Sequence, residues 1–293
     1  MNTTRVVSVF FLIGLLSVGC TRRADKPQET SAGAAPLKPS SVSVKGSDTM
    51  VLLGQRWAEG YMAAHPGSSI QVTGGGSGTG IASLINGTTD VCESSRAMKD
   101  KERAELKSKQ GKDAVEIKVA LDALAVYVHA SNALGSLSVQ DVGRIYRGEL
   151  TNWKALGGAD HAIVLYGREN NSGTYGYFKE HVLENKDFAA GVQTLAGTSA
   201  VASAVKGDPY SIGYGGIAYL EGVKALQLKK DASSPAVAPN LQTAQSGEYP
   251  VSRPLFFYTA GPATGTAADF VTWVQGPDGQ KVITAVGYYP LPK

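Results

Sequence analysis

Residues 163–174 have the sequence Ile-Val-Leu-Tyr-Gly-Arg-Glu-Asn-Asn-Ser-Gly-Thr, in which an apolar run passes through a polar turn into hydroxyl and glycine residues. The apolar residues 163–167 predict a buried strand, and Ser172–Leu183 predicts a helix. This unit therefore joins a strand to the start of a helix through a short turn. A chain built from such units is an α/β protein with a largely parallel sheet.

Two other segments repeat this arrangement earlier in the chain. Gly46-Ser47-Asp48-Thr49 separates a predicted strand from a predicted helix at 49–64, and the glycine-rich segment Gly74–Gly80 separates a strand from a helix at 79–86. The predicted strands besides 163–167 are 41–44, 69–73, 90–94, 114–120, 123–129, 211–214, 225–228 and 253–259. The remaining predicted helices are at 99–110, from Ser138 onward, at 266–274 and at 280–286.

The number of strands predicts two sheets, one in each of two lobes, with a ligand cleft between the lobes. Strand patterns continue through 122–124 and 252–254 without an intervening helix, so we expect the chain to cross between the lobes there. Residues 41–122 plus 254–293 would then form lobe 1, and residues 123–253 would form lobe 2.

The N-terminal residues 1–19 have the features of a bacterial lipoprotein signal peptide. A short segment with one positive charge precedes an uncharged apolar run that is too short to span a bilayer. Gly19 then precedes Cys20, the predicted site of lipidation, and residues 20–40 predict a flexible tether. We therefore expect a protein exported and lipid-anchored to the cell envelope, in the periplasm or on the outer face of a membrane. The alternative is ordinary signal cleavage with Cys20 unmodified.

Composition excludes some classes of function. The formal net charge is +3, and the chain has no long basic run with interleaved aromatic residues, so nucleic-acid binding is not expected. The four histidines show no ligand spacing with cysteine or carboxylate residues, so we expect neither a metal nor another cofactor. They are His65, His129, His161 and His181.

The segment that follows strand 163–167 combines a cation with hydrogen-bond donors. Arg168 can hold two oxygens of a tetrahedral anion through its planar guanidinium. Ser172, Gly173 and Thr174 begin a helix, where unpaired backbone N–H groups and the helix dipole favour an anion. The segment therefore predicts a binding site for a small oxyanion. In the alternative interpretation, Ser172 only caps the helix and Arg168 pairs with Glu169 or another surface acid.

The two earlier glycine and hydroxyl segments offer further donors to the same site. Thr49 and Ser77 contribute hydroxyl groups at predicted helix starts, and glycine lets a ligand approach the backbone closely. Asp48 has two interpretations: it caps the helix, or it accepts the proton of a monoprotonated phosphate. The second role would select phosphate over sulfate, because sulfate carries no proton at neutral pH.

Ser94-Ser95-Arg96 follows a predicted strand and adds two hydroxyl groups and a second cation. These residues complete the floor of the pocket, or Arg96 forms a salt bridge between the lobes. The sequence leaves both interpretations open.

The glycine-rich segment does not match the motifs of common enzymes. It lacks the Gly-Lys-Ser/Thr ending of a nucleotide P-loop, and Thr79 stands where both a dinucleotide fingerprint and a serine-hydrolase elbow require glycine. We therefore expect a protein that binds without catalysing a reaction.

Four segments, in this order, resemble those of the phosphate-binding proteins of bacterial ABC phosphate transporters: Gly46–Thr49, Gly74–Gly80, Ser94–Arg96 and Arg168–Thr174. The resemblance extends through Asn152-Trp153, Ser211–Gly215 and Gly287–Leu291, and its most specific element is the Arg-x-x-x-Ser-Gly-Thr pattern that begins at Arg168. It covers residues 41–293. It implies the two-lobed periplasmic-binding-protein fold of type II, with hinge closure over a buried phosphate.

The resemblance also implies ligands and partners. Arg168, Ser172, Gly173 and Thr174 would bind phosphate from lobe 2, and Asp48, Thr49 and Ser77 would bind it from lobe 1. One departure matters: the family usually places its proton-accepting aspartate where this chain has Ser95. The implied function is capture of inorganic phosphate, as a monomer, and its delivery to permease subunits. The alternatives are another oxyanion (sulfate, molybdate or a phosphonate) or a surface sensor or adhesin without a transport role.

Overall fold

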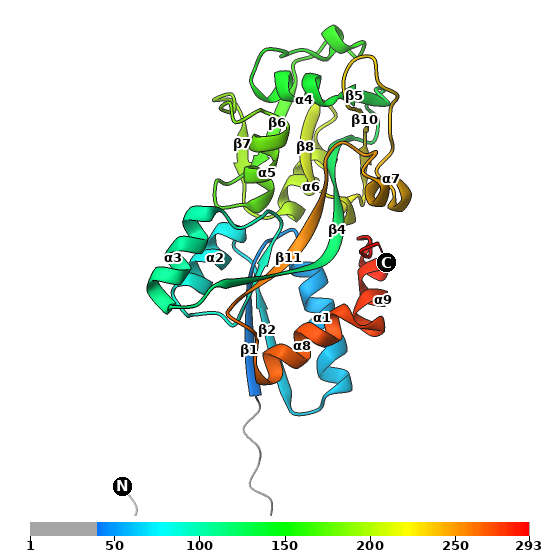
Figure 1. Cartoon of the computed structure of the whole chain (residues 1–293). Coiled ribbons are helices and arrows are strands. Elements are labelled where there is room, and N and C mark those ends of the chain that lie inside the picture. The colour runs from blue at the N-terminus through cyan, green and yellow to red at the C-terminus, as the bar shows by residue number, and fades with distance from the viewer. Residues whose placement is uncertain (1–39, 293) are drawn as a thin grey trace, which may run out of the picture. The chain divides into compact units, whose positions relative to one another are not determined.

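The computed structural model describes residues 40–292 (Figure 1). The predicted signal peptide 1–19, the lipidation site Cys20 and the predicted tether up to residue 39 lie outside the described residues. Within 40–292, no helix combines the length and the apolar character that crossing a membrane requires.

Strands and helices alternate along much of the described chain. The elements up to the middle of the chain are β1 (Ser40–Gly46), α1 (Val51–Ala64), β2 (Ser68–Thr73), α2 (Ser77–Ile85), β3 (Val91–Ser94), α3 (Asp100–Gln110), β4 (Ala114–His129), β5 (Ser136–Ser138), α4 (Val139–Tyr146) and the 3₁₀ helix η1 (Trp153–Leu156). The later elements are β6 (Val164–Arg168), α5 (Gly173–His181), β7 (Gln193–Leu195), α6 (Thr198–Gly207), β8 (Ser211–Gly216), the 3₁₀ helix η2 (Ile217–Tyr219), β9 (Val223–Ala225), β10 (Gln227–Lys229), α7 (Leu241–Ser246), β11 (Ser252–Ala260), α8 (Gly265–Gln275) and α9 (Pro277–Val286).

The strands of residues 40–292 form one long sheet and a separate pair, β10 with β5. The order of the long sheet is β2-β1-β3-β11-β4-β8-β6-β7, and β9 also pairs with β4. The outer neighbours β1–β2, β1–β3, β6–β7 and β6–β8 are parallel, as strand–turn–helix units require, whereas β11 and β4 run antiparallel to their neighbours.

Strands β4 and β11 carry the chain between the two lobes, and Figure 1 shows them running side by side from one group of elements to the other. The first part of β4 pairs with β11 in lobe 1, and Leu124–Val128 pairs with β8 in lobe 2. The predicted separation into two sheets is therefore wrong, because the predicted strands 114–120 and 123–129 are one strand that both lobes share.

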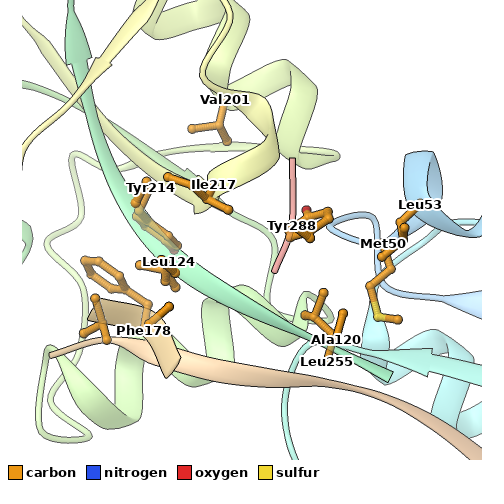
Figure 2. Close-up of a cluster of buried hydrophobic side chains, with 14 of the residues drawn as sticks. Met50, Leu53, Ala120, Leu124, Phe178, Val201, Tyr214, Ile217, Leu255 and Tyr288 are labelled. Carbon is orange, nitrogen blue, oxygen red and sulfur yellow. The ribbon is translucent and has the colours of Figure 1, made fainter. Parts of the chain in front are cut away.

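Buried apolar side chains form one large cluster that extends through both lobes and a smaller one around α2 and α3. One cluster includes Met50 and Leu53 near the start of α1, Leu124 on β4, and Phe178 and Tyr214 in lobe 2. Figure 2 shows these side chains arranged along β4 and β11. The shared strands thus position the helix starts of the two lobes toward one another.

Candidate functional site

Hydroxyl groups from several helix starts meet in one buried cluster. The Oγ1 atoms of Thr49 and Thr174 are 2.7 Å apart, and Thr198 lies 3.4 Å from Thr49. Ser95 Oγ lies 3.4 Å from both Thr174 Oγ1 and Ser77 Oγ. All five side chains are at most 1% exposed. Because they come from segments far apart in the sequence, this hydroxyl cluster exists only in the folded chain.

Each contributing helix begins at the cluster for a local reason. Ser172 caps α5 by accepting a hydrogen bond from the backbone N–H of Tyr175 at 3.3 Å. Gly76 precedes α2 with φ of +89°, and a Cβ atom there would lie 2.7 Å from the carbonyl oxygen of Asn171. Only glycine satisfies both requirements. The starts of α2 and α5 therefore lie beside the hydroxyl cluster, where the partial positive charge of a helix start favours an anion.

Arg168 ends β6 beside the cluster, and its side chain is 1% exposed. Its Nη1 donates to Thr198 Oγ1 at 2.8 Å, and its Nη2 pairs with Asp48 Oδ2 at 2.7 Å. Its Nε–H is buried and has no hydrogen-bond partner among the described residues. Burial lowers the pKa of Arg168, and the neighbouring Asp48 opposes that shift. A buried donor without a partner is costly, so the geometry favours an acceptor at this place.

Asp48 bridges the two lobes instead of capping a helix. Its Oδ1 accepts the backbone N–H of Gly75 at 2.7 Å, and its Oδ2 holds Arg168. Helix α1 begins after Met50 without any side-chain cap, so the capping interpretation of Asp48 is not observed. Arg168 does pair with an acid, but that acid is Asp48 of the opposite lobe, 120 residues away in the sequence, rather than Glu169 or another surface acid.

Two predicted residues point elsewhere. Ser94 Oγ donates to the carbonyl oxygen of Arg96 at 2.7 Å, which closes a local turn. The Arg96 guanidinium forms two hydrogen bonds to Glu102 of α3, at 2.7 and 2.8 Å. Because Glu102 belongs to lobe 1, the salt bridge of Arg96 lies within one lobe and does not join the two.

Gly173 marks the closest approach between the lobes at the cluster. A Cβ atom there would collide with Ser77 Oγ and lie 2.7 Å from Ser95 Oγ. Asn171 adds further contacts across the cleft: its carbonyl oxygen accepts Gly78 N–H at 2.8 Å, and its side-chain amide donates to Gly75 carbonyl oxygen at 3.0 Å. The glycine-rich segment thus docks against lobe 2 as well as facing the cluster.

Sequence reasoning missed Thr198, Arg253 and Tyr219. Arg253 forms a buried pair with Asp122, whose Oδ2 lies 2.8 Å from its Nη2, and that nitrogen also donates to Thr174 Oγ1 at 3.0 Å. Tyr219 donates to the carbonyl oxygen of Asp48 at 3.0 Å. Thr198 could have been found, since Gly197-Thr198-Ser199 repeats the glycine and hydroxyl pattern before a helix.

The charges around the cluster are balanced within the protein. Arg168 is paired with Asp48, and Arg253 is paired with Asp122. A bound anion would therefore depend on N–H and O–H donors and on helix starts more than on excess positive charge. Among residues 40–292, no group of three or more histidine, cysteine or carboxylate side chains could hold a metal ion.

A cavity of about 920 Å³ adjoins the hydroxyl cluster on the α5 side. It lies between the turn after β3, helix α5 and the start of β11, and its lining includes Arg96, Ser172, Lys179 and Arg253. Ser172 and Arg253 therefore border both the cavity and the region of the cluster.

Comparison with known proteins agrees with this geometry. Residues 27–278 match the family model described as PBP superfamily domain. The phosphate-binding protein PstS of Pseudomonas aeruginosa (strain PAO1) is 36% identical over 269 residues, which cover 86% of this chain and 83% of the relative. The chain belongs to the PstS family. PstS of Bacillus subtilis (strain 168) is 30% identical over 282 residues, covering 96% of this chain and 91% of the relative.

The PstS-family assignment extends to solved structures. A structure described as a phosphate ABC transporter substrate-binding protein with bound phosphate, from Clostridium perfringens, superposes with a TM-score of 0.79 at 26% identity. The match covers 86% of this chain and 100% of that one. The predicted fold, an α/β protein of two lobes related to periplasmic binding proteins, is thereby confirmed.

Proposed function

We propose that this PstS-family protein binds inorganic phosphate outside the cytoplasm and delivers it to the permease of an ABC transporter. Phosphate would lie between the lobes, held by Arg168, Thr174 and the N–H groups of Gly173 and the α5 start. Asp48, Thr49, Ser77 and Ser95 would complete its surroundings. No bond of phosphate is broken in this role, so the protein acts as a binding protein and not as an enzyme.

The observation that carries the proposal is the buried Nε–H of Arg168, which lacks a partner among residues 40–292 and lies beside the hydroxyl cluster. A tetrahedral oxyanion supplies acceptor oxygens to such a donor and to several hydroxyl groups together. The names of the relatives and the bound phosphate in the Clostridium perfringens structure support phosphate as that oxyanion. They do not favour sulfate, molybdate or a phosphonate.

Asp48 supports a preference for phosphate over sulfate. Its carboxylate is the acid that lies against Arg168, and a proton-bearing phosphate could donate to it, whereas sulfate at neutral pH could only repel it. Asp48 would thereby supply the acceptor that the family usually has at the position of Ser95.

Calorimetric titration with phosphate and with sulfate tests the proposal, after unfolding and refolding have removed any bound anion. We expect phosphate to bind and sulfate to give no heat at neutral pH. In Asp48→Asn, the difference between the two anions should narrow, because the amide no longer repels sulfate. A protein that binds neither anion would contradict the proposed function, and equal binding of both by the parent would contradict the role of Asp48.

Gly173→Ala should weaken phosphate binding, because the new methyl group collides with Ser77 and Ser95 across the closed cleft. Overpacking costs about 1–3 kcal/mol, or roughly 5- to 150-fold in Kd. Gly207→Ala is the matched control, since nothing lies within 4 Å of a Cβ atom added there. Equal Kd values for the two variants would show that Gly173 does not lie this close to Ser77 and Ser95 when phosphate is bound.

The proposal includes the setting of the protein. Cys20 would carry the lipid that holds the protein at the cell envelope, and the protein would act as a monomer alongside the permease subunits. Lobe 1 would comprise 41–122 plus 254–293, and lobe 2 would comprise 123–253. The pairing of Ala123 with Ser252 supports crossings at these positions.

A further inference from the structure

Glu93 is an acid that neither the fold nor the proposed phosphate site explains. It lies on β3 directly before Ser94 and Ser95, and its side chain is completely buried. Neither carboxyl oxygen has a hydrogen-bond partner among the described residues. Buried acids are normally paired or hydrogen-bonded, so an acid without partners at this place requires a functional explanation.

The surroundings of Glu93 are apolar or acidic. Its carboxyl group fits against Gly54 of α1, where any Cβ atom would collide with it, and Val72 of β2 lies beside the same place. In the strand ladder Glu93 is paired with Gly46 of β1 and Phe257 of β11. None of these neighbours can neutralise a negative charge.

Among residues 40–292, the titratable groups that act electrostatically on or with Glu93 are Asp48, Tyr219 and Cys92. No cation is among them. Burial, and secondly the negative charge of Asp48, raise the pKa of Glu93 well above its ordinary value. The backbone also places Glu93 beside the residues proposed to surround phosphate: its carbonyl oxygen accepts a hydrogen bond from the N–H of Ser47, the residue before Asp48, at 2.9 Å.

We propose that Glu93 is held as an uncharged carboxylic acid and sets the charge of the phosphate site, so that its ionisation and anion binding exclude one another. This inference rests on the proposed function. Because Arg168 and Arg253 are already paired with acids, an ionised Glu93 would give the site a net negative charge before any anion arrives. Glu93 is thus a residue that positions no ligand atom but controls affinity through its proton.

The sign of the pH dependence follows from linkage. In the unfolded chain, Glu93 loses its proton near the ordinary pKa of about 4.3, whereas the folded protein retains it to higher pH. Above that value the unfolded state binds fewer protons than the folded state. Folding therefore weakens as pH rises, by about tenfold in the equilibrium constant per pH unit at most, until the folded protein also ionises.

Glu93→Gln tests this prediction without phosphate, because glutamine resembles the neutral acid and cannot ionise. We expect the folding constant of the variant, divided by that of the parent, to rise between pH 5 and 8 in urea titrations. Glu59→Gln of α1 is the matched control, as its side chain is 60% exposed, and its ratio should stay constant. A pH-independent ratio for Glu93→Gln would overturn the proposal.

Phosphate titrations of the same proteins test the link to binding. The ionisation of phosphate itself is common to all of them and cancels in the ratio of Kd values. We expect the parent to lose affinity relative to Glu93→Gln as pH rises from 7 to 10, with Glu59→Gln following the parent. Parallel profiles for the parent and Glu93→Gln would overturn the control of affinity by Glu93. If none of the proteins bound phosphate, the proposed function would be contradicted. The urea titrations would still decide whether folded Glu93 keeps its proton.

Discussion

Arg168→Ala should abolish phosphate binding at concentrations where the parent protein is saturated. The guanidinium is buried, donates to Thr198 and holds Asp48, and its Nε–H beside the hydroxyl cluster has no partner in the part of the chain that the structure describes. Removing one partner of a desolvated charge pair costs about 3–5 kcal/mol, which is roughly 150- to 5,000-fold in Kd. Part of that loss would come from Asp48, which would face the anion as an unpaired carboxylate. Calorimetry on the anion-free variant measures the effect.

Arg144→Ala provides the control for Arg168→Ala. Arg144 lies on α4, its side chain is 43% exposed, and it pairs with Asp141 and Glu149 of the same lobe. Its replacement should leave Kd unchanged. The Arg168→Lys variant should bind phosphate with an affinity between those of the parent and of Arg168→Ala. Lysine keeps the positive charge but loses the planar arrangement of guanidinium donors. An Arg168→Ala protein that binds phosphate as tightly as the parent would remove Arg168 from the site.

Asp122→Asn should strongly destabilise the folded protein, whether or not phosphate is bound. Asp122 is fully buried on β4, and its carboxylate accepts from Arg253 and from the backbone N–H of Ile217. Asparagine fills the same volume but leaves the Arg253 charge buried without its partner. The free energy of unfolding should fall by about 3–5 kcal/mol. Urea titrations without phosphate measure this change.

Asp278→Asn is the control for the buried pair. Asp278 contacts Lys281 on the surface of α9, and both side chains are more than half exposed. Such pairs contribute about 0–1 kcal/mol. If both aspartate variants lost the same small amount of stability, the pair between β4 and β11 would not be the structural link that its burial indicates.

The strand–turn–helix units of lobe 1 were predictable because each has its own local signal. The predicted helices at 79–86 and 99–110 correspond to α2 (Ser77–Ile85) and α3 (Asp100–Gln110). Helix α6 was missed, although Gly197 and Thr198 mark its start. The division of β4 into two predicted strands has a clear cause: Asp122 interrupts an apolar run. Only the fold supplies Arg253 on the neighbouring strand, which lets a charge remain inside the sheet.

The candidate site was predictable where its residues lie in a local sequence pattern, as the elements of lobe 1 were. Glycine and hydroxyl patterns identify helix starts, so Thr49, Ser77 and Thr174 could be named, and the structure brings all three to the hydroxyl cluster. Partner choice is a long-range property. Nothing local indicates that Asp48 holds an arginine from the other lobe, 120 residues away in the sequence.

The β4–β11 ladder also bears on how such a molecule could be assembled from parts. Ala123, where the chain enters the proposed lobe 2, is paired in register with Ser252, where the chain returns. The two ends of the intervening segment are therefore neighbours. A domain that is inserted into a loop of another domain has the same geometry. Lobe 2 could be exchanged as a cassette between homologues by joining at these paired positions, with the backbone path of lobe 1 kept intact. Ligand preference could then change through recombination of lobe 2, while the surfaces of lobe 1 stayed constant.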